Sequence, residues 1–164
     1  MERIHLKETY LDIDYNRLSN RSETDQVVIH HTGNPTDDDL SAAEINASHK
    51  ARGWSCIGYH YVIRKDGTVE QGRPHWTIGA HAYGHNSHTI GIHMCGNFEI
   101  GEPTVAQIES LALLLANLCT DYGLMIDRDT IVGHRELMST ACPGRNLFAQ
   151  MNTIVGKANF YANQ

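Results

Sequence analysis

The sequence predicts an α/β fold: a single domain with a mixed central β-sheet flanked by helices. Three observations predict it: short runs rich in β-branched residues, one long segment with apolar residues at helical spacing, and one tight hairpin signal. At 164 residues the chain has the usual length of one domain, and it shows no repeat or linker. Residues 1–25 are polar and weakly patterned, so we expect an N-terminal arm over 1–25 and the folded domain over 26–164.

Short apolar runs between turn-forming residues predict the strands of this sheet. In the first, alternation places Val28 and His30 on one face and Ile29 and His31 on the other, so only one of the two histidines can face a given site. The segment Lys65-Asp66-Gly67 predicts a turn between two antiparallel strands. Strands are expected at residues 26–31, 57–64, 68–71, 89–94 and 130–133.

Helix starts are marked by two capping boxes, in which a hydroxyl residue and a Glu or Gln three positions later satisfy free N–H groups. Ser41 and Glu44 form the first box, and Thr104 and Gln107 form the second. The apolar stripe that follows Thr104 predicts a helix packed on the core. Helices are expected at residues 41–52, 104–122 and 147–156.

Composition excludes some classes of function. The net charge is −6 and no block of Lys or Arg occurs, so neither nucleic acid nor an anionic membrane is an expected partner. No long apolar run predicts a membrane span. The four cysteines are not expected to pair, because a domain of this size does not need disulfides.

Most of the 11 histidines need no function. Five lie in polar stretches and are expected to be solvated: His5, His49, His75, His85 and His88. His60 and His93 lie in strand patterns, where packed and hydrogen-bonded side chains are expected. Two others, His30 and His134, stand out because each ends an apolar β run.

These two histidines and one cysteine predict a metal site. His30 and His134 each lie where a strand passes into a loop, and Cys142 precedes Pro-Gly in a loop just after His134. Neutral imidazole and thiolate are ligands that Zn²⁺ prefers, and three protein ligands with one open position are the catalytic arrangement. A purely structural zinc site would need a fourth ligand, and no residue has suitable spacing.

A zinc hydrolase also needs a hydrogen-bond donor for the oxyanion of the transition state. Tyr59, at the start of the segment 59–63, can supply such a hydroxyl. The alternative, favoured by the residues alone, is that Tyr59 is simply a half-buried aromatic residue of the strand.

The chain resembles zinc-dependent N-acetylmuramoyl-L-alanine amidases, the superfamily of phage amidase-type lysozymes and peptidoglycan recognition proteins. The resemblance covers about residues 26–148, and the motifs occur in the order found in the family. These motifs are Ile29-His30-His31-Thr32, Gly58-Tyr59-His60-Tyr61-Val62-Ile63, Asp66-Gly67-Thr68-Val69, Gly79-Ala80-His81-Ala82, Asn86 with Ser87-His88-Thr89-Ile90-Gly91-Ile92, and Gly133-His134-Arg135-Glu136 followed by Cys142-Pro143-Gly144.

The resemblance implies an amidase and recognition-protein fold and assigns roles by position. It makes His30, His134 and Cys142 the zinc ligands and Tyr59 the catalytic tyrosine. Thr140 stands where phage lysozymes carry a catalytic lysine, as in many catalytic recognition proteins, and is expected to assist as a polar group.

Two further residues, His81 and Asn86, match loop positions near the substrate groove. They are expected to bind the muropeptide, with the alternative that they only hold the loop. His31 is expected to pack or to support the ligands from behind.

The implied function is a peptidoglycan hydrolase that cleaves the amide between N-acetylmuramic acid and L-alanine of the stem peptide. Members that only bind peptidoglycan usually carry serine at the third ligand position, so Cys142 favours hydrolysis over the alternative of a non-catalytic binding module. The expected partner is peptidoglycan and the expected state is a monomer.

No signal peptide is visible at the N-terminus. We therefore expect either cytoplasmic synthesis without a signal, with action on the cell wall after release as in a phage or prophage endolysin, or a removed export signal. Both a free-standing lysin and the catalytic domain of a longer protein are compatible with the sequence.

Overall fold

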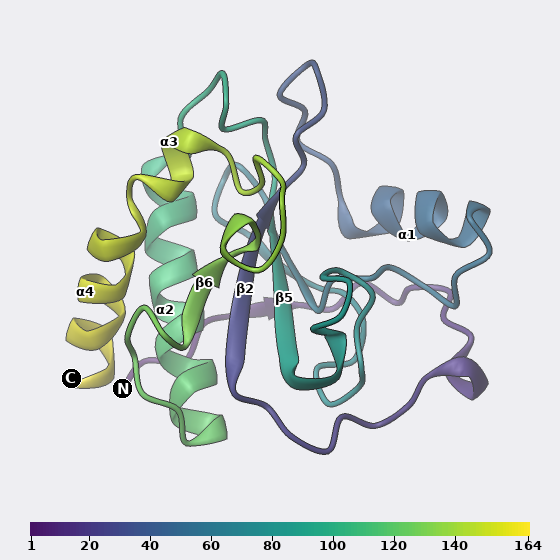
Figure 1. Ribbon diagram of the computed structural model, residues 1–164, viewed down its shortest axis with the longest axis horizontal. Coiled ribbons are helices and arrows are strands. Elements are labelled where there is room, and N and C mark those ends of the chain that lie inside the picture. Colours follow the sequence, from purple (N-terminus) through teal and green to yellow (C-terminus); the bar gives the residue numbers. More distant parts are fainter.

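The computed structural model describes residues 1–164 and contains one six-stranded sheet with helices on both faces (Figure 1). The strand order is β1-β4-β3-β5-β2-β6, and every neighbouring pair is parallel except β3 with β4. The sheet is therefore mixed, as predicted. The strands are β1 (Leu6–Lys7), β2 (Gln26–His31), β3 (Tyr61–Ile63), β4 (Val69–Gln71), β5 (Thr89–Met94) and β6 (Ile131–Gly133).

The helices divide between the two faces of the sheet. In Figure 1, α2 (Val105–Tyr122) and α4 (Met151–Ala162) lie side by side on one face, while α1 (Ala42–Ala51) lies beyond the other. The main apolar core fills the space between the sheet and the pair α2 and α4. A smaller cluster joins α1 to the opposite face. Short helices complete the chain: η1 (Tyr15–Arg17), η2 (Asn86–His88), η3 (His134–Glu136) and α3 (Arg145–Phe148).

Strand alternation decides which residues face the site. Val27 and Ile29 of β2 belong to the main core, and His31 stacks on Phe98 of that same side. His30 therefore points to the opposite face, toward α1. This separation of the two adjacent histidines confirms the alternation expected from the sequence.

Both predicted capping boxes are present. Ser41 caps α1 by accepting from the Glu44 N–H, and Thr104 caps α2 by accepting from the Gln107 N–H. Gly123 ends α2 in the left-handed region at φ 68°, where a side chain would be strained. The helix carries its apolar stripe onto the core, as its spacing predicted.

Three predicted elements differ in extent. The N-terminal arm contributes β1, which pairs in parallel with β4, and its Ile4 N–H donates to Asn117 of α2 at 2.8 Å. The strand expected over 57–64 is reduced to β3. The terminal helix expected over 147–156 is two helices, α3 and α4, the second of which extends to Ala162.

The segment just before β3 packs closely on residues 79–81. Gly58 lies so close to the 79–81 segment that a Cβ atom at Gly58 would be 2.0 Å from the Ala80 carbonyl oxygen. Residues 59 and 60 still make backbone hydrogen bonds, from the His60 N–H to the Gly91 carbonyl oxygen at 2.9 Å and from the Arg73 N–H to the Tyr59 carbonyl oxygen at 2.8 Å, but they lie outside the regular strand. Tyr59 therefore projects from an irregular segment.

All four cysteines are free, and none of the helices is long and apolar enough to cross a membrane. Cys56, Cys95 and Cys119 are fully buried and behave as small apolar residues, whereas Cys142 is partly exposed. Cys142 is therefore the one cysteine whose thiol solvent or a ligand can reach.

Candidate metal centre and its cavity

The register of β2 and β6 brings two of the predicted ligands together. Ile29 lies opposite Gly133 in this parallel pair, so the residues that follow, His30 and His134, leave the same edge of the sheet side by side. Their ring centroids are 4.5 Å apart. The carboxyl ends of neighbouring parallel strands thus place both imidazoles at one point.

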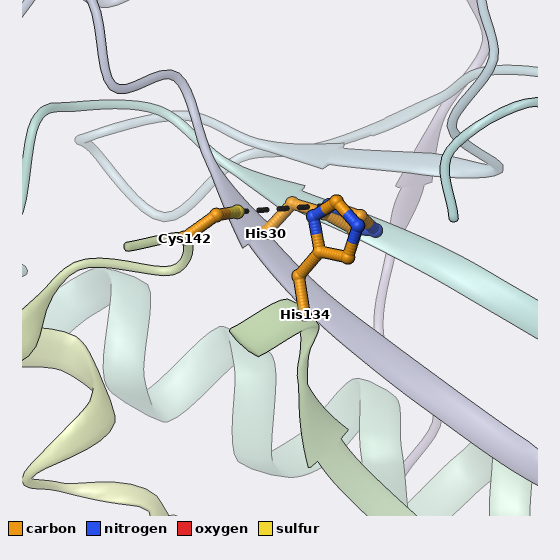
Figure 2. Close-up of side chains that lie close together, drawn as sticks. All are labelled: His30, His134 and Cys142. Carbon is orange, nitrogen blue, oxygen red and sulfur yellow. Dashed lines mark hydrogen bonds between the residues drawn. The ribbon is translucent and has the colours of Figure 1, made fainter. Parts of the chain in front are cut away.

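Cys142 reaches the same point from the loop that follows η3 (Figure 2). Its carbonyl oxygen accepts from the Arg135 N–H at 2.8 Å, which anchors this loop beside His134. The thiol sulfur lies 3.7 Å from His30 Nδ1 and accepts from the backbone N–H of His31 at 3.4 Å. The strand that carries the first ligand therefore also holds the cysteine.

The three side chains form a compact donor set. Their ligand-capable atoms all lie within 4.8 Å of one another, and no other group of three or more such residues in the chain meets this condition. His134 Nε2 is buried without a hydrogen-bond partner. Two imidazoles and one thiol with an unsatisfied buried nitrogen fit a zinc ion in ligand type and number.

Burial controls the protonation of this donor set. It lowers the pKa of His30 well below its usual value, with further lowering from the neighbouring His81 and His134. It also lowers the pKa of His134. Burial raises the pKa of the Cys142 thiol to about 12, an effect partly opposed by the N–H of His31. Both imidazoles are therefore neutral at pH 7, and the thiol gives up a proton only to a strong partner such as a metal.

Tyr59 lies against the donor set. Its ring contacts that of His30 edge-on, with centroids 5.1 Å apart, and it lines a cavity of about 340 Å³ together with His134. Burial raises the pKa of Tyr59, so its hydroxyl keeps its proton and can act only as a neutral donor or acceptor. This position suits both an oxyanion donor and a packed aromatic residue.

Thr140 lies on the loop that carries Cys142. Its Oγ1 accepts a hydrogen bond from the Cys142 N–H at 3.2 Å. The hydroxyl therefore helps to fix the cysteine, and it keeps its own proton for another acceptor.

His81 and Asn86 contact the site in different ways. The side-chain oxygen of Asn86 accepts from the N–H groups of both His81 and Ala82 at 2.9 Å, so it holds the loop. His81 Nδ1 lies 2.9 Å from His30 Nε2. Both residues line the 340 Å³ cavity, but the hydrogen bonds of their side chains go to other residues of the chain.

One contributor was not predicted from the sequence. His49 was expected to be solvated, but it is 8% exposed and its Nδ1 accepts from the Gly58 N–H at 2.9 Å. It lines the cavity with Arg52, Trp54 and Met138. Its position on the inner side of α1, next to Ile45 of the apolar cluster, was the available signal, because His49 lies four residues after Ile45.

Another cavity, of about 360 Å³, lies between the N-terminal arm and residues 71–76. It contains none of the predicted ligands, and His60 is the nearest histidine of the motifs to line it. His60 is buried and fully bonded, to the Thr77 carbonyl oxygen and to the Gly91 N–H. The predicted metal ligands therefore lie at the 340 Å³ cavity lined by Tyr59 and His134, and not at this one.

The fold and site define a class: a mixed α/β domain with two histidines and one cysteine at the carboxyl edge of a sheet, open to a cavity with a tyrosine. Residues 20–145 match the family described as N-acetylmuramoyl-L-alanine amidase. The chain belongs to this family.

Individual relatives agree with this assignment. The chain is 34% identical to an endolysin of Klebsiella phage KP32, over 80% of this chain and 87% of that protein. It is 36% identical to the human N-acetylmuramoyl-L-alanine amidase, over 76% of this chain but 23% of the human protein. A solved endolysin amidase of Clostridium intestinale superposes with a TM-score of 0.84 at 33% identity, covering 94% of this chain and 97% of that one.

Proposed function

We infer that this chain is a peptidoglycan hydrolase of the endolysin type, and we propose that it hydrolyses the amide between N-acetylmuramic acid and L-alanine with a bound zinc ion. The observation that carries the proposal is the donor set of His30, His134 and Cys142, within 4.8 Å of one another beside a 340 Å³ cavity. A structural zinc site would be closed by a fourth protein ligand, and the donor set contains three.

The chain's own residues divide the work of hydrolysis. His30, His134 and Cys142 would hold the ion, and Cys142 would lose its proton on binding it. A zinc ion bound there supplies a Lewis acid for the scissile carbonyl group and lowers the pKa of a bound water to about 7. Tyr59 would donate a hydrogen bond from its hydroxyl group to the oxyanion that develops on the carbonyl oxygen.

Thr140 is proposed to assist from the Cys142 loop. Its hydroxyl proton is available because Oγ1 acts as the acceptor for the Cys142 N–H. It brings no charge to the oxyanion, so we assign the larger share of stabilisation to Tyr59. His81 and Asn86 shape the wall of the cavity that receives the muropeptide.

Mass spectrometry of digested peptidoglycan tests this function directly. Purified walls incubated with the zinc-loaded protein should release stem peptides with a free L-alanine amine, and the glycan strands should keep their muramic acid. New reducing ends without free L-alanine would identify a glycosidase instead. Sedimentation of the protein with walls, without any released peptide, would identify a binding module.

A further inference from the structure

We propose that His81 is a positioning residue for the metal centre: it fixes the tautomer of His30, so that the His30 Nδ1 lone pair points at the site shared with Cys142 and His134. The proposal rests on the proposed zinc function. It replaces the expectation that His81 binds the muropeptide, because both ring nitrogens of His81 are engaged inside the protein.

The direction of these hydrogen bonds is set at a backbone carbonyl group. The Thr89 hydroxyl lies 2.8 Å from the His85 carbonyl oxygen, which can only accept, so Thr89 gives its proton there. Thr89 Oγ1 also lies 3.2 Å from His81 Nε2. Since the single hydroxyl proton is already used in the shorter bond, His81 Nε2 must be the donor in the second.

A neutral ring carries one N–H and one lone pair, so a proton on His81 Nε2 leaves its Nδ1 as an acceptor. His81 Nδ1 lies 2.9 Å from His30 Nε2, and His30 Nε2 must therefore carry the proton. The remaining nitrogen, His30 Nδ1, then has its lone pair free, 3.7 Å from the Cys142 sulfur.

These contacts require a neutral His81 ring, in which Nε2 donates to Thr89 Oγ1 and Nδ1 accepts from His30 Nε2. A protonated His81 would reverse the bond to His30 and place a proton on the nitrogen that faces Cys142.

The ring of His81 is also held sterically. A Cβ atom at Gly91 would lie 2.5 Å from the Cγ atom of His81, and one at Gly79 would lie 2.8 Å from its Cδ2 atom. A side chain at either position would overlap the His81 ring, so glycine is needed at both. Because the side chain of Asn86 binds the His81 N–H, the backbone is fixed as well. A ligand histidine commonly donates its other N–H to a fixed acceptor, and His81 is that acceptor here.

The first test reads the tautomers by NMR on the full chain with ¹⁵N-labelled histidine, without metal and with zinc. Both His30 and His81 should carry their proton on Nε2 in the two states. The assignments come from the loss of one ring system in His30→Gln and of the other in His81→Asn. A proton on Nδ1 of His30 in the metal-free protein, or on Nδ1 of His81 in either state, would overturn the proposal.

The second test measures zinc affinity by competition with a chromophoric chelator. His81→Leu removes the acceptor and should weaken zinc binding about 10- to 100-fold. His81→Asn places a carbonyl oxygen close to the position of Nδ1 and should restore most of the affinity. Thr89→Val removes the acceptor for His81 Nε2 and should give an intermediate loss, with the other tautomer of His30 becoming visible by NMR.

Urea unfolding separates positioning from a structural role. If His81 only packs the loop, His81→Leu should lower stability but leave zinc affinity and the His30 tautomer as in the wild type, and the proposal fails. Equal losses of zinc affinity in His81→Leu and His81→Asn would also overturn it. If the wild-type protein binds no zinc, the proposed function fails, while the NMR test of the two tautomers still stands by itself.

Discussion

Replacing Cys142 should lower the zinc content of the protein most directly, because it supplies the one thiol of the donor set. Its sulfur lies 3.7 Å from His30 Nδ1 and is the only thiol in the donor set. We predict about one zinc per chain in the wild type and loss of most of it in Cys142→Ala, by elemental analysis after gel filtration. Cys119→Ala, which alters a cysteine buried in α2, is the matched control and should keep its zinc. Full zinc retention by Cys142→Ala would remove this residue from the site.

Tyr59 offers a test of catalysis against packing. Tyr59→Phe keeps the ring that contacts His30 and removes only the hydroxyl. If that hydroxyl stabilises the oxyanion, the rate should fall about 10²- to 10³-fold with zinc content and fold unchanged. Substrate affinity should change little, because the bond strengthens only as charge develops. A rate within about twofold of the wild type would assign Tyr59 to packing, since a donor to the oxyanion is worth far more.

The capping box at the start of α2 should contribute measurably to the free energy of unfolding. The hydroxyl of Thr104 accepts from the Gln107 N–H and donates to the Lys65 carbonyl oxygen at 2.6 Å, so it joins the helix to the turn of the β3–β4 hairpin. Thr104→Ala should cost about 1 to 2 kcal/mol in urea unfolding at pH 7.

The conservative variant Thr104→Ser keeps both hydrogen bonds and should stay close to the wild type. If Thr104→Ala unfolds at the same urea concentration as Thr104→Ser, the hydroxyl does not hold the helix, and the apolar stripe alone accounts for its stability.

The sequence allowed β2, which carries His30, and β5 beside it to be predicted with their observed bounds, because both are β-branched runs with clear ends. Proximity of His30 and His134 followed from their places at strand ends, and the register of β2 with β6 supplies the cause. The pairing of β1 could not be predicted, since a two-residue strand has no periodicity of its own.

Individual histidines were harder to place than the strands. His49 was missed because its spacing from Ile45 was the only local signal, and the contacts that complete its burial come from Trp54 and Gly58, which lie outside α1. The bond between His81 and His30 joins residues 51 positions apart in the sequence, and no local pattern specifies it. Residue type and strand ends thus predicted the residues that cluster in the structure, whereas the hydrogen bonds from His81 and Asn86 around that cluster depend on tertiary structure.

At the scale of the whole molecule, the buried histidines predict loss of stability in acid. Burial lowers the pKa of His49 to about 4 and the pKa values of His60 and His93 to about 3. In the unfolded chain they titrate near 6.5, so below that pH the unfolded state binds more protons than the folded state. The free energy of unfolding should therefore be greatest above about pH 6.5 and should fall as the pH drops toward 4.

His49 provides the variant for this prediction. His49→Asn keeps an acceptor for the Gly58 N–H but does not titrate, so its loss of stability between pH 7 and 4.5 should be smaller than that of the wild type, by an amount on the order of 1 to 3 kcal/mol. Urea unfolding with a chelator present measures the difference without metal-linked protons. Parallel stability curves for the two proteins would show that the pKa of His49 is the same in the folded and unfolded states.

The short strand β1 has a consequence for handling the protein. By pairing with β4 it covers what would otherwise be an open sheet edge, and Arg3 and Ile4 tie the arm to Asp121 and Asn117 of α2. A chain shortened to begin after Lys7 would leave the N–H and C=O groups of Val69–Gln71 free to recruit a strand from another molecule. The shortened protein should self-associate at high concentration. Its proposed metal centre should stay intact, because that site lies at β2 and β6, at the opposite end of the strand order from β1. Light scattering beside zinc analysis would show whether the edge or the site depends on these first residues.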